Sequence, residues 1–235
     1  MTVLRVASYN IRAGLGADLR RDAARVLRAI DALEADIVAL QEADFRLGTR
    51  PAALPVSAIA GATGLVPMPV DTHPESLGWH GNALLLRRDI RVRDHHLLSL
   101  PGLEPRGALI ADLAIPGMRD IRVVALHLGL LRSSRRKQLS AIKVHLVNLP
   151  PAATLWMGDF NERSVKVGLG RLLPQFQVVT PGATYPVRRP RWPLDRFAHS
   201  DRLVLTPLPV PQPLPGDGHA SDHRPIVAEL SARST

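Results

Sequence analysis

The chain has 235 residues, of which 46% are hydrophobic and 22% are charged, a balance typical of a globular protein. It contains no cysteine, which excludes disulfides, thiolate metal sites and a cysteine nucleophile. Its net charge of +9 favours anionic partners, among them nucleic acid, phospholipid head groups and small phosphates. An arginine-rich compositional bias accounts for the charge equally well, so charge alone selects no function.

The start of the chain carries no targeting signal. Residues 1–6 lead directly into a strand-like run, without a basic segment followed by an apolar one. No stretch approaches the roughly 18 consecutive apolar residues of a membrane span. We therefore expect a cytoplasmic, monomeric protein without a transmembrane segment, folded as one domain over residues 1–235.

The first elements predict an α/β fold. Residues 4–11 are densely apolar, as in a strand covered on both faces. Residues 20–33 carry apolar side chains at intervals of three and four, which predicts an amphipathic helix. Residues 36–42 again resemble a strand. This strand–helix–strand opening is typical of a layered α/β protein.

Three further strands are predicted in the middle of the chain, at residues 82–87, 108–115 and 121–128. The pair Pro116-Gly117 separates the last two and indicates a hairpin.

The second half predicts one more helix and two more strands. The helix spans residues 136–149 and is ended by two prolines, and the strands span residues 154–158 and 225–230. The proline-rich segment 207–215 is expected to be an irregular loop. Together these elements indicate two sheets sandwiched between helices.

Polar residues stand at the ends of several apolar strands, namely Asn10, Glu42, His127, Asp159 and Asn161. Any one of them is best explained as a cap or a turn residue. Five such residues at the ends of four strands instead indicate a cleft, because polar groups converge at strand ends in α/β proteins and an unpartnered buried carboxylate is costly.

The residue types suggest the chemistry of this cleft. Carboxylate and amide oxygens from Glu42, Asp159, Asp222, Asn10 and Asn161, without cysteine, suit a hard cation such as Mg²⁺ or Mn²⁺. Histidines beside carboxylates can transfer protons near neutral pH. A hard cation with a proton-transfer group meets the requirements for attack on a phosphoester.

Seven segments resemble, in order, the motifs of the endonuclease/exonuclease/phosphatase superfamily, which includes deoxyribonuclease I, exonuclease III-type repair nucleases, neutral sphingomyelinases and inositol polyphosphate 5-phosphatases. The resemblance extends from residue 3 to about residue 230. The segments are Tyr9-Asn10-Ile11-Arg12, Leu40-Gln41-Glu42, Gly81-Asn82-Ala83-Leu84-Leu85, His127-Leu128, Gly158-Asp159-Phe160-Asn161, Leu194-Asp195-Arg196 and Ser221-Asp222-His223-Arg224-Pro225.

This resemblance implies a four-layer α/β/β/α sandwich with two mixed, mostly antiparallel sheets, and a metal-dependent phosphoesterase of bacterial type. It implies that Glu42 is the principal ligand of Mg²⁺ or Mn²⁺, with Asn10 and Asp222 beside it. Asp159 would orient or deprotonate the attacking water, and Asn161 would hold that water or the phosphoryl oxygens.

The resemblance also implies roles for the histidines. His223 would be hydrogen-bonded to Asp195, which favours the imidazolium, and His127 would contact the phosphate oxygens. Attack would be in line on phosphorus, without a covalent enzyme intermediate. Whether Asp159 or His223 is the base stays open, as does the number of metal ions.

Three residues are weaker candidates for substrate binding. Asn82 matches a family position near the cleft, although a Gly-Asn pair is also common in turns. Arg106 could contact phosphate or be an ordinary surface arginine. Tyr185 could line the substrate groove or pack internally. The basic run at residues 132–137 could reach an anionic substrate, but such runs are usually solvated.

The substrate has two main candidates. The net charge of +9 slightly favours nucleic acid, whereas the compact chain and its 4% aromatic content are compatible with a phospholipid head group or a small phosphate ester. An inactive binding module is disfavoured because Glu42, Asp159 and His223 are all present.

Overall fold

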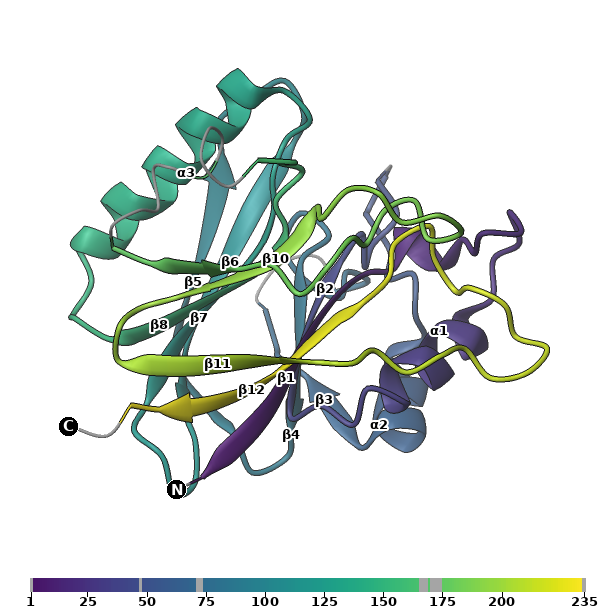
Figure 1. Ribbon diagram of the computed structural model, residues 1–235, viewed down its shortest axis with the longest axis horizontal. Coiled ribbons are helices and arrows are strands. Elements are labelled where there is room, and N and C mark those ends of the chain that lie inside the picture. Colours follow the sequence, from purple (N-terminus) through teal and green to yellow (C-terminus); the bar gives the residue numbers. More distant parts are fainter. Residues whose placement is uncertain (1, 47, 71–73, 165–168, 170–174, 234–235) are drawn as a thin grey trace.

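The computed structural model describes residues 2–46, 48–70, 74–164, 169 and 175–233, which form two six-stranded sheets packed face to face (Figure 1). The first sheet has the order β11-β12-β1-β2-β4-β3, and the second has the order β5-β6-β7-β8-β10-β9. Among the strands of the described residues, only the pairs β1–β2 and β7–β8 are parallel. The strands of the first sheet are β1 (Val3–Asn10), β2 (Ile37–Gln41), β3 (Leu65–Pro67), β4 (Ala83–Arg87), β11 (Leu203–Leu208) and β12 (Ile226–Ala232), and those of the second are β5 (Arg91–Leu100), β6 (Arg106–Ala114), β7 (Ile121–His127), β8 (Ala153–Asp159), β9 (Gln177–Val179) and β10 (Asp195–His199).

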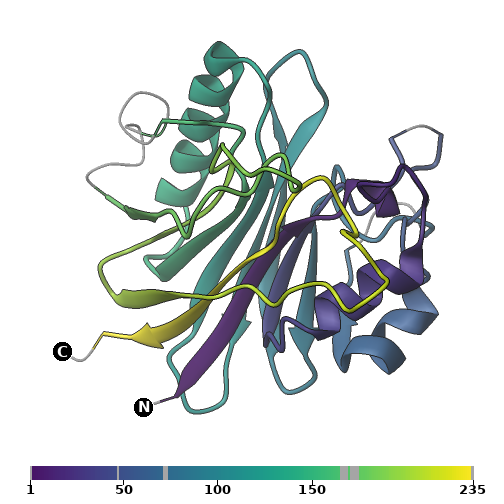
Figure 2. The same cartoon turned by 45° about the vertical axis from the view of Figure 1, so that its right-hand side comes forward.

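Helices cover the outer face of each sheet, which gives the four layers expected from the sequence. Helices α1 (Ala23–Asp31) and α2 (Val56–Thr63) lie on the first sheet, and α3 (Arg132–Val147) lies on the second (Figure 2). A single 3-10 turn, η1 (Arg12–Gly14), follows β1. Among the described residues, no helix is both long enough and apolar enough to cross a membrane.

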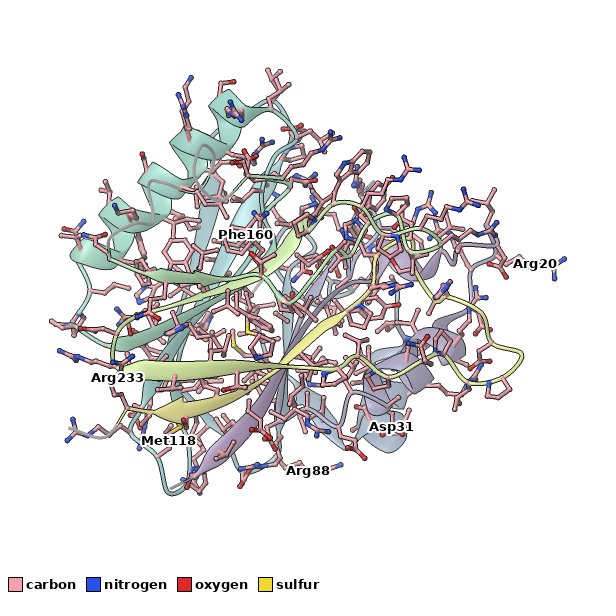
Figure 3. The ribbon with its side chains drawn as sticks, in the orientation of Figure 1. Arg20, Asp31, Arg88, Met118, Phe160 and Arg233 are labelled. Atoms are coloured by element: carbon pink, nitrogen blue, oxygen red, sulfur yellow. The ribbon has the colours of Figure 1, made fainter. Side chains whose placement is uncertain are left out.

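Three apolar layers hold the sandwich together. The alternation of side chains along β1 shows how: Leu4 and Val6 pack between the sheets, whereas Ala7 and Tyr9 pack beneath the helices. A third layer joins α3 to the second sheet and contains Phe160, the residue after the last residue of β8 (Figure 3). These strands are buried on both faces, which is why the sequence shows them as continuous apolar runs.

The predicted elements differ from the observed ones mainly at their ends. The first helix begins only after Asp22, whose side chain accepts a hydrogen bond from the Arg25 amide as an N-cap. The second predicted helix corresponds to α3, which begins at Arg132, four residues earlier than predicted. Pro207 lies in β11 and not in an irregular loop. The predicted hairpin is confirmed by the antiparallel pairing of β6 with β7.

Strand register positions the polar residues at one end of the sandwich. In the second sheet, Asp159 lies directly opposite His127 on β7 and Asp195 on β10. In the first sheet, Asn10 lies opposite Gln41, the residue before Glu42. The ends of five strands therefore meet around one point.

Gly158 permits this arrangement, because its φ of +154° suits glycine and an added Cβ would overlap the Leu126 carbonyl oxygen on β7. We predict that Gly158→Ala lowers the free energy of unfolding by about 1–3 kcal/mol, since rigid backbone must move to make room. Urea unfolding monitored by circular dichroism measures the change.

Gly61, inside α2, is the matched control, because a Cβ there meets nothing within 4 Å. Gly61→Ala should raise stability by about 0.5–1 kcal/mol. Equal effects of the two substitutions would contradict the steric explanation.

Candidate active site

A buried carboxylate, Asp159, is the centre of the site. It is 1% exposed and lies at the end of β8. Asn10, from the opposite sheet, donates its Nδ2 hydrogen to Asp159 Oδ2 over 3.1 Å. The backbone amide of Asn161 donates to Oδ1 over 2.8 Å, and Asn161 itself has a φ of +50°. Both oxygens are thus fixed in direction by the fold.

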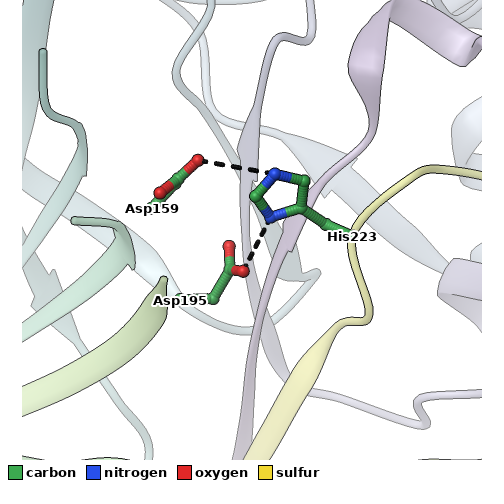
Figure 4. Close-up of side chains that lie close together, drawn as sticks. All are labelled: Asp159, Asp195 and His223. Carbon is green, nitrogen blue, oxygen red and sulfur yellow. Dashed lines mark hydrogen bonds and ion pairs between the residues drawn. The ribbon is translucent and has the colours of Figure 1, made fainter. Parts of the chain in front are cut away.

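His223 lies between two carboxylates (Figure 4). Its Nδ1 is 2.8 Å from Asp195 Oδ2, and its Nε2 is 3.8 Å from Asp159 Oδ2. Ligand atoms of these three buried residues all lie within 4.8 Å of one another, so they form a possible metal-binding triad. The expected bond between His223 and Asp195 is present in the structure.

The two carboxylates determine the charge of His223. Burial lowers the pKa of the imidazole, but the charge and hydrogen bond of Asp195 and the charge of Asp159 outweigh burial and raise it to about 10. Burial and the charge of Asp195 raise the pKa of Asp159 to about 6. At neutral pH the metal-free site therefore holds an ionised Asp159 beside a protonated His223.

His127 is held in one neutral tautomer. Burial, followed by the positive charges of Arg106 and His223, lowers its pKa well below the ordinary value. Arg106 Nη1 lies 3.0 Å from His127 Nδ1, and because a guanidinium can only donate, Nδ1 is the acceptor. The proton is then on Nε2, which lies 3.4 Å from Asp159 Oδ2. His127 thus presents a neutral N–H donor to the centre.

Hydrogen bonds from the Ser221-Asp222-His223 segment join it to the end of β1. Ser221 Oγ donates to the Asn10 carbonyl oxygen over 2.6 Å and accepts from the His223 amide over 3.2 Å. Ser221 is fully buried. It therefore fixes the position of His223 relative to Asn10.

Two further predicted ligands, Glu42 and Asp222, lie at the more exposed edge of the site. Glu42 follows β2 with a φ of +51°, and its Oε1 accepts a hydrogen bond from Arg46 over 2.9 Å. No described residue donates to its Oε2. Asp222 Oδ2 lies 3.2 Å from Arg12 Nε. Both carboxylates are partly solvent-accessible, unlike Asp159.

The structure also places the weaker candidates. Arg106 lines a small cleft of about 40 Å³ together with Glu42 and His127. Asn82 is buried, and its Nδ2 donates to the Gly107 and Trp79 carbonyl oxygens over 3.0 and 3.2 Å. Asn82 thereby ties its turn to the start of β6, next to Arg106.

Arg135 is neither solvated nor free to reach a substrate. It is 7% exposed, and its Nη2 donates to Glu162 Oε2 over 2.7 Å. Arg135 lies within α3 on its buried side and joins the helix to the segment after Asn161. The interpretation of this arginine as part of a basic surface was therefore wrong.

A row of side chains in ring contact extends from His223 through Tyr185 to Trp192. The Tyr185 ring lies 4.9 Å from the His223 ring, and Trp192 is nearly parallel to Tyr185 at 5.9 Å. The Arg163 guanidinium covers Trp192 at 3.7 Å. Sequence reasoning missed Arg163, because nothing in its spacing from Trp192 indicates a contact.

Comparison with known proteins agrees with this geometry. The model of the Endonuclease/Exonuclease/phosphatase family matches residues 7–223. The chain belongs to this family. The uncharacterized protein YbhP of Escherichia coli (strain K12) is 28% identical over 260 residues, covering 96% of this chain and 95% of YbhP.

Solved structures share the fold at lower identity. The human Nocturnin catalytic domain with bound sulfate is 19% identical with a TM-score of 0.74, covering 98% of this chain and 95% of that domain. D. rerio TDP2 complexed with a single-strand DNA product is 18% identical with a TM-score of 0.71, covering 98% of this chain and all of that one.

The charge state of His223 can be tested in the metal-free protein. We predict that its imidazole titrates with a pKa of about 10 and that Asp195→Asn lowers this pKa toward or below 6.5, because burial is then less opposed. Two-dimensional NMR of the imidazole nitrogens against pH, in EDTA, measures both.

Asp201→Asn, in the exposed turn after β10, is the control and should leave the titration unchanged. A His223 pKa near 6.5 in the unsubstituted protein would rule out the assigned charge state.

Proposed function

We propose that this chain is a Mg²⁺- or Mn²⁺-dependent phosphodiesterase in which an activated water attacks phosphorus in line, with nucleic acid as the favoured substrate. The observation that carries the proposal is the buried Asp159 carboxylate. It is held by Asn10 and Asn161 and lies beside two histidines of opposite protonation state.

The donor set fits a hard cation, which we assign to Glu42 with Asn10 and Asp222. All three offer oxygen atoms, and Glu42 Oε2 has no hydrogen bond from a described residue. The triad of Asp159, Asp195 and His223 is a poorer site, because His223 Nδ1 and Asp195 Oδ2 already share a hydrogen bond. A bound cation would neutralise phosphate charge and polarise the phosphoryl group.

The chain's own residues carry the proton transfers. Asp159 is the proposed base, because His223 keeps its proton between the carboxylates of Asp195 and Asp159 and cannot accept another. Asn161 is the proposed residue that positions the water or a phosphoryl oxygen. The Nε2 hydrogens of His127 and His223 would stabilise charge on phosphoryl oxygens as it develops.

The row of side chains in ring contact favours nucleic acid. Base stacking and cation–π contacts use the same aromatic face, so a nucleobase can replace the exposed guanidinium of Arg163 on Trp192. The net charge of +9 acts in the same direction.

A phospholipid head group is a second candidate, supported by exposed leucines near the site. Leu130 and Leu131 follow the His127 segment and are 65% and 48% exposed, and Leu103 in the β5–β6 loop is 83% exposed. The Leu130 amide donates to Glu104, the neighbour of Leu103, so the two loops adjoin. Exposed leucines on two adjoining loops beside the site suit contact with a lipid surface.

The metal assignment predicts that Glu42→Gln weakens Mn²⁺ binding at least about tenfold, because a charged ligand is lost. Titration of Mn²⁺ followed by electron paramagnetic resonance measures this affinity. Asp195→Asn should bind Mn²⁺ nearly as well as the unsubstituted protein. The reverse order of affinities would place the ion in the Asp159–Asp195–His223 triad instead.

Hydrolysis itself is tested on a substrate panel of plasmid DNA, a single-stranded oligonucleotide, phosphatidylcholine vesicles and bis-p-nitrophenyl phosphate, with Mg²⁺, Mn²⁺ or EDTA. We predict metal-dependent turnover that Asp159→Asn lowers by about 10²–10⁴-fold without altering the fold. Retention of more than a few per cent of the rate would refute the role of Asp159, and no turnover of any ester would refute the proposed function.

Trp192→Ala separates the substrate classes within the same panel. Loss of stacking should slow oligonucleotide cleavage about 5- to 100-fold and spare the small diester. Turnover restricted to vesicles and insensitive to Trp192→Ala would favour the phospholipid head group.

A further inference from the structure

A second, larger cavity lies next to His223, which is one of its lining residues. Its volume is about 630 Å³, within the range of about 300–1,000 Å³ typical of small-molecule sites. It is enclosed by α1, the segment 181–190 and the segment that follows β11. Figures 1 and 2 both show the last of these running alongside α1.

The walls of this cavity are mainly apolar. They are formed largely by aliphatic side chains and prolines, and the aromatic rings among the lining residues are those of Tyr9, His219 and His223. Such walls offer little to a nucleobase, which needs flat aromatic faces, and suit a flexible aliphatic group better.

One polar group in the wall lacks a partner. Tyr9 is 3% exposed, and no described residue hydrogen-bonds its hydroxyl. Because Tyr9 lines the cavity, an acceptor group on a ligand there can accept the phenolic hydrogen.

The three arginines that line the cavity differ in whether a carboxylate neutralises them. Arg25 and Arg28 are each neutralised by a carboxylate, Asp18 and Asp217 respectively, through paired hydrogen bonds. Arg224 also lines the cavity, but among the described residues it forms no ion pair. Its Nε donates weakly to the Val187 carbonyl oxygen over 3.3 Å, and its two Nη groups bond no described residue. An anion can therefore bind Arg224 without displacing a carboxylate.

We propose that this cavity binds an amphiphilic anion, an alkyl chain with a terminal carboxylate or phosphonate-like group, through Tyr9 and Arg224. The alkyl chain packs against the aliphatic and proline walls. The anionic group accepts hydrogen bonds from the phenol of Tyr9 and from the two Nη groups of Arg224.

The cavity adjoins the active site, because His223 is one of its lining residues. Val187, in its wall, donates to the Asp222 carbonyl oxygen over 2.7 Å, and the Arg224 amide donates to the Thr184 carbonyl oxygen over 2.9 Å. A ligand in the cavity therefore contacts the segments that hold His223 and Tyr185 in place.

Isothermal titration calorimetry of the full chain in EDTA tests this proposal with three ligands: decanoate, decylphosphonate and decan-1-ol. We expect saturable binding of one molecule of decanoate or decylphosphonate, and binding of decan-1-ol at least about tenfold weaker. Binding of decan-1-ol as tight as that of both anions, or no saturable binding of any of the three, would overturn the proposal.

Variants place the ligand. Tyr9→Phe, which keeps the ring, and Arg224→Gln should each weaken binding of the anion about tenfold. Arg88→Gln removes the same charge from an exposed arginine that does not line the cavity (Figure 3), and it should have no effect. Melting temperatures show whether each variant is folded. Equal weakening by Arg88→Gln, or none by either cavity variant if both fold, would contradict binding at this site.

Discussion

Burial of the Asp159 carboxylate where the two sheets meet is the constraint that organises the rest of the site. A charge with 1% exposure is costly unless it is hydrogen-bonded and faces opposite charge. Asn10 comes from the other sheet, Asn161 from the following turn, and His223 from a segment that Ser221 fixes to β1. The requirement to satisfy one carboxylate thus aligns groups from both halves of the sandwich, and it leaves the neighbouring imidazole charged.

The sequence predicted which residues gather in the site better than it predicted how they contact one another. Strand-end residues such as Asn10 and Asp159 could be identified from the sequence, because an apolar run that ends in a polar residue indicates that the residue lies in a shared site. The Arg106–His127 hydrogen bond, which sets the histidine tautomer, could not be predicted from the sequence. It joins two strands through side-chain directions that the periodicity of the sequence does not encode. Arg135 was misinterpreted for a related reason. A run of basic residues in the sequence does not show which of them faces the interior of the protein.

Complete burial made several strands predictable, although β10, which is also buried throughout, was not predicted. Strands β1, β2 and β7 are buried on both faces and appear as apolar runs. Strand β5 is a half-exposed edge strand with charged residues along it, so its pattern resembles a loop. Helix α2 is short and almost wholly apolar, which removes the polar face that identifies an amphipathic helix.

In the proposed mechanism, water activated at Asp159 attacks phosphorus directly. His127 and His223 both lie within 4 Å of Asp159, so a covalent phosphohistidine is the alternative that the geometry raises. The stereochemical course of hydrolysis of a phosphorothioate diester, chiral at phosphorus, in isotopically labelled water separates the two. One in-line displacement by water predicts inversion at phosphorus. Net retention would require two displacements through an enzyme-bound intermediate and would contradict the account.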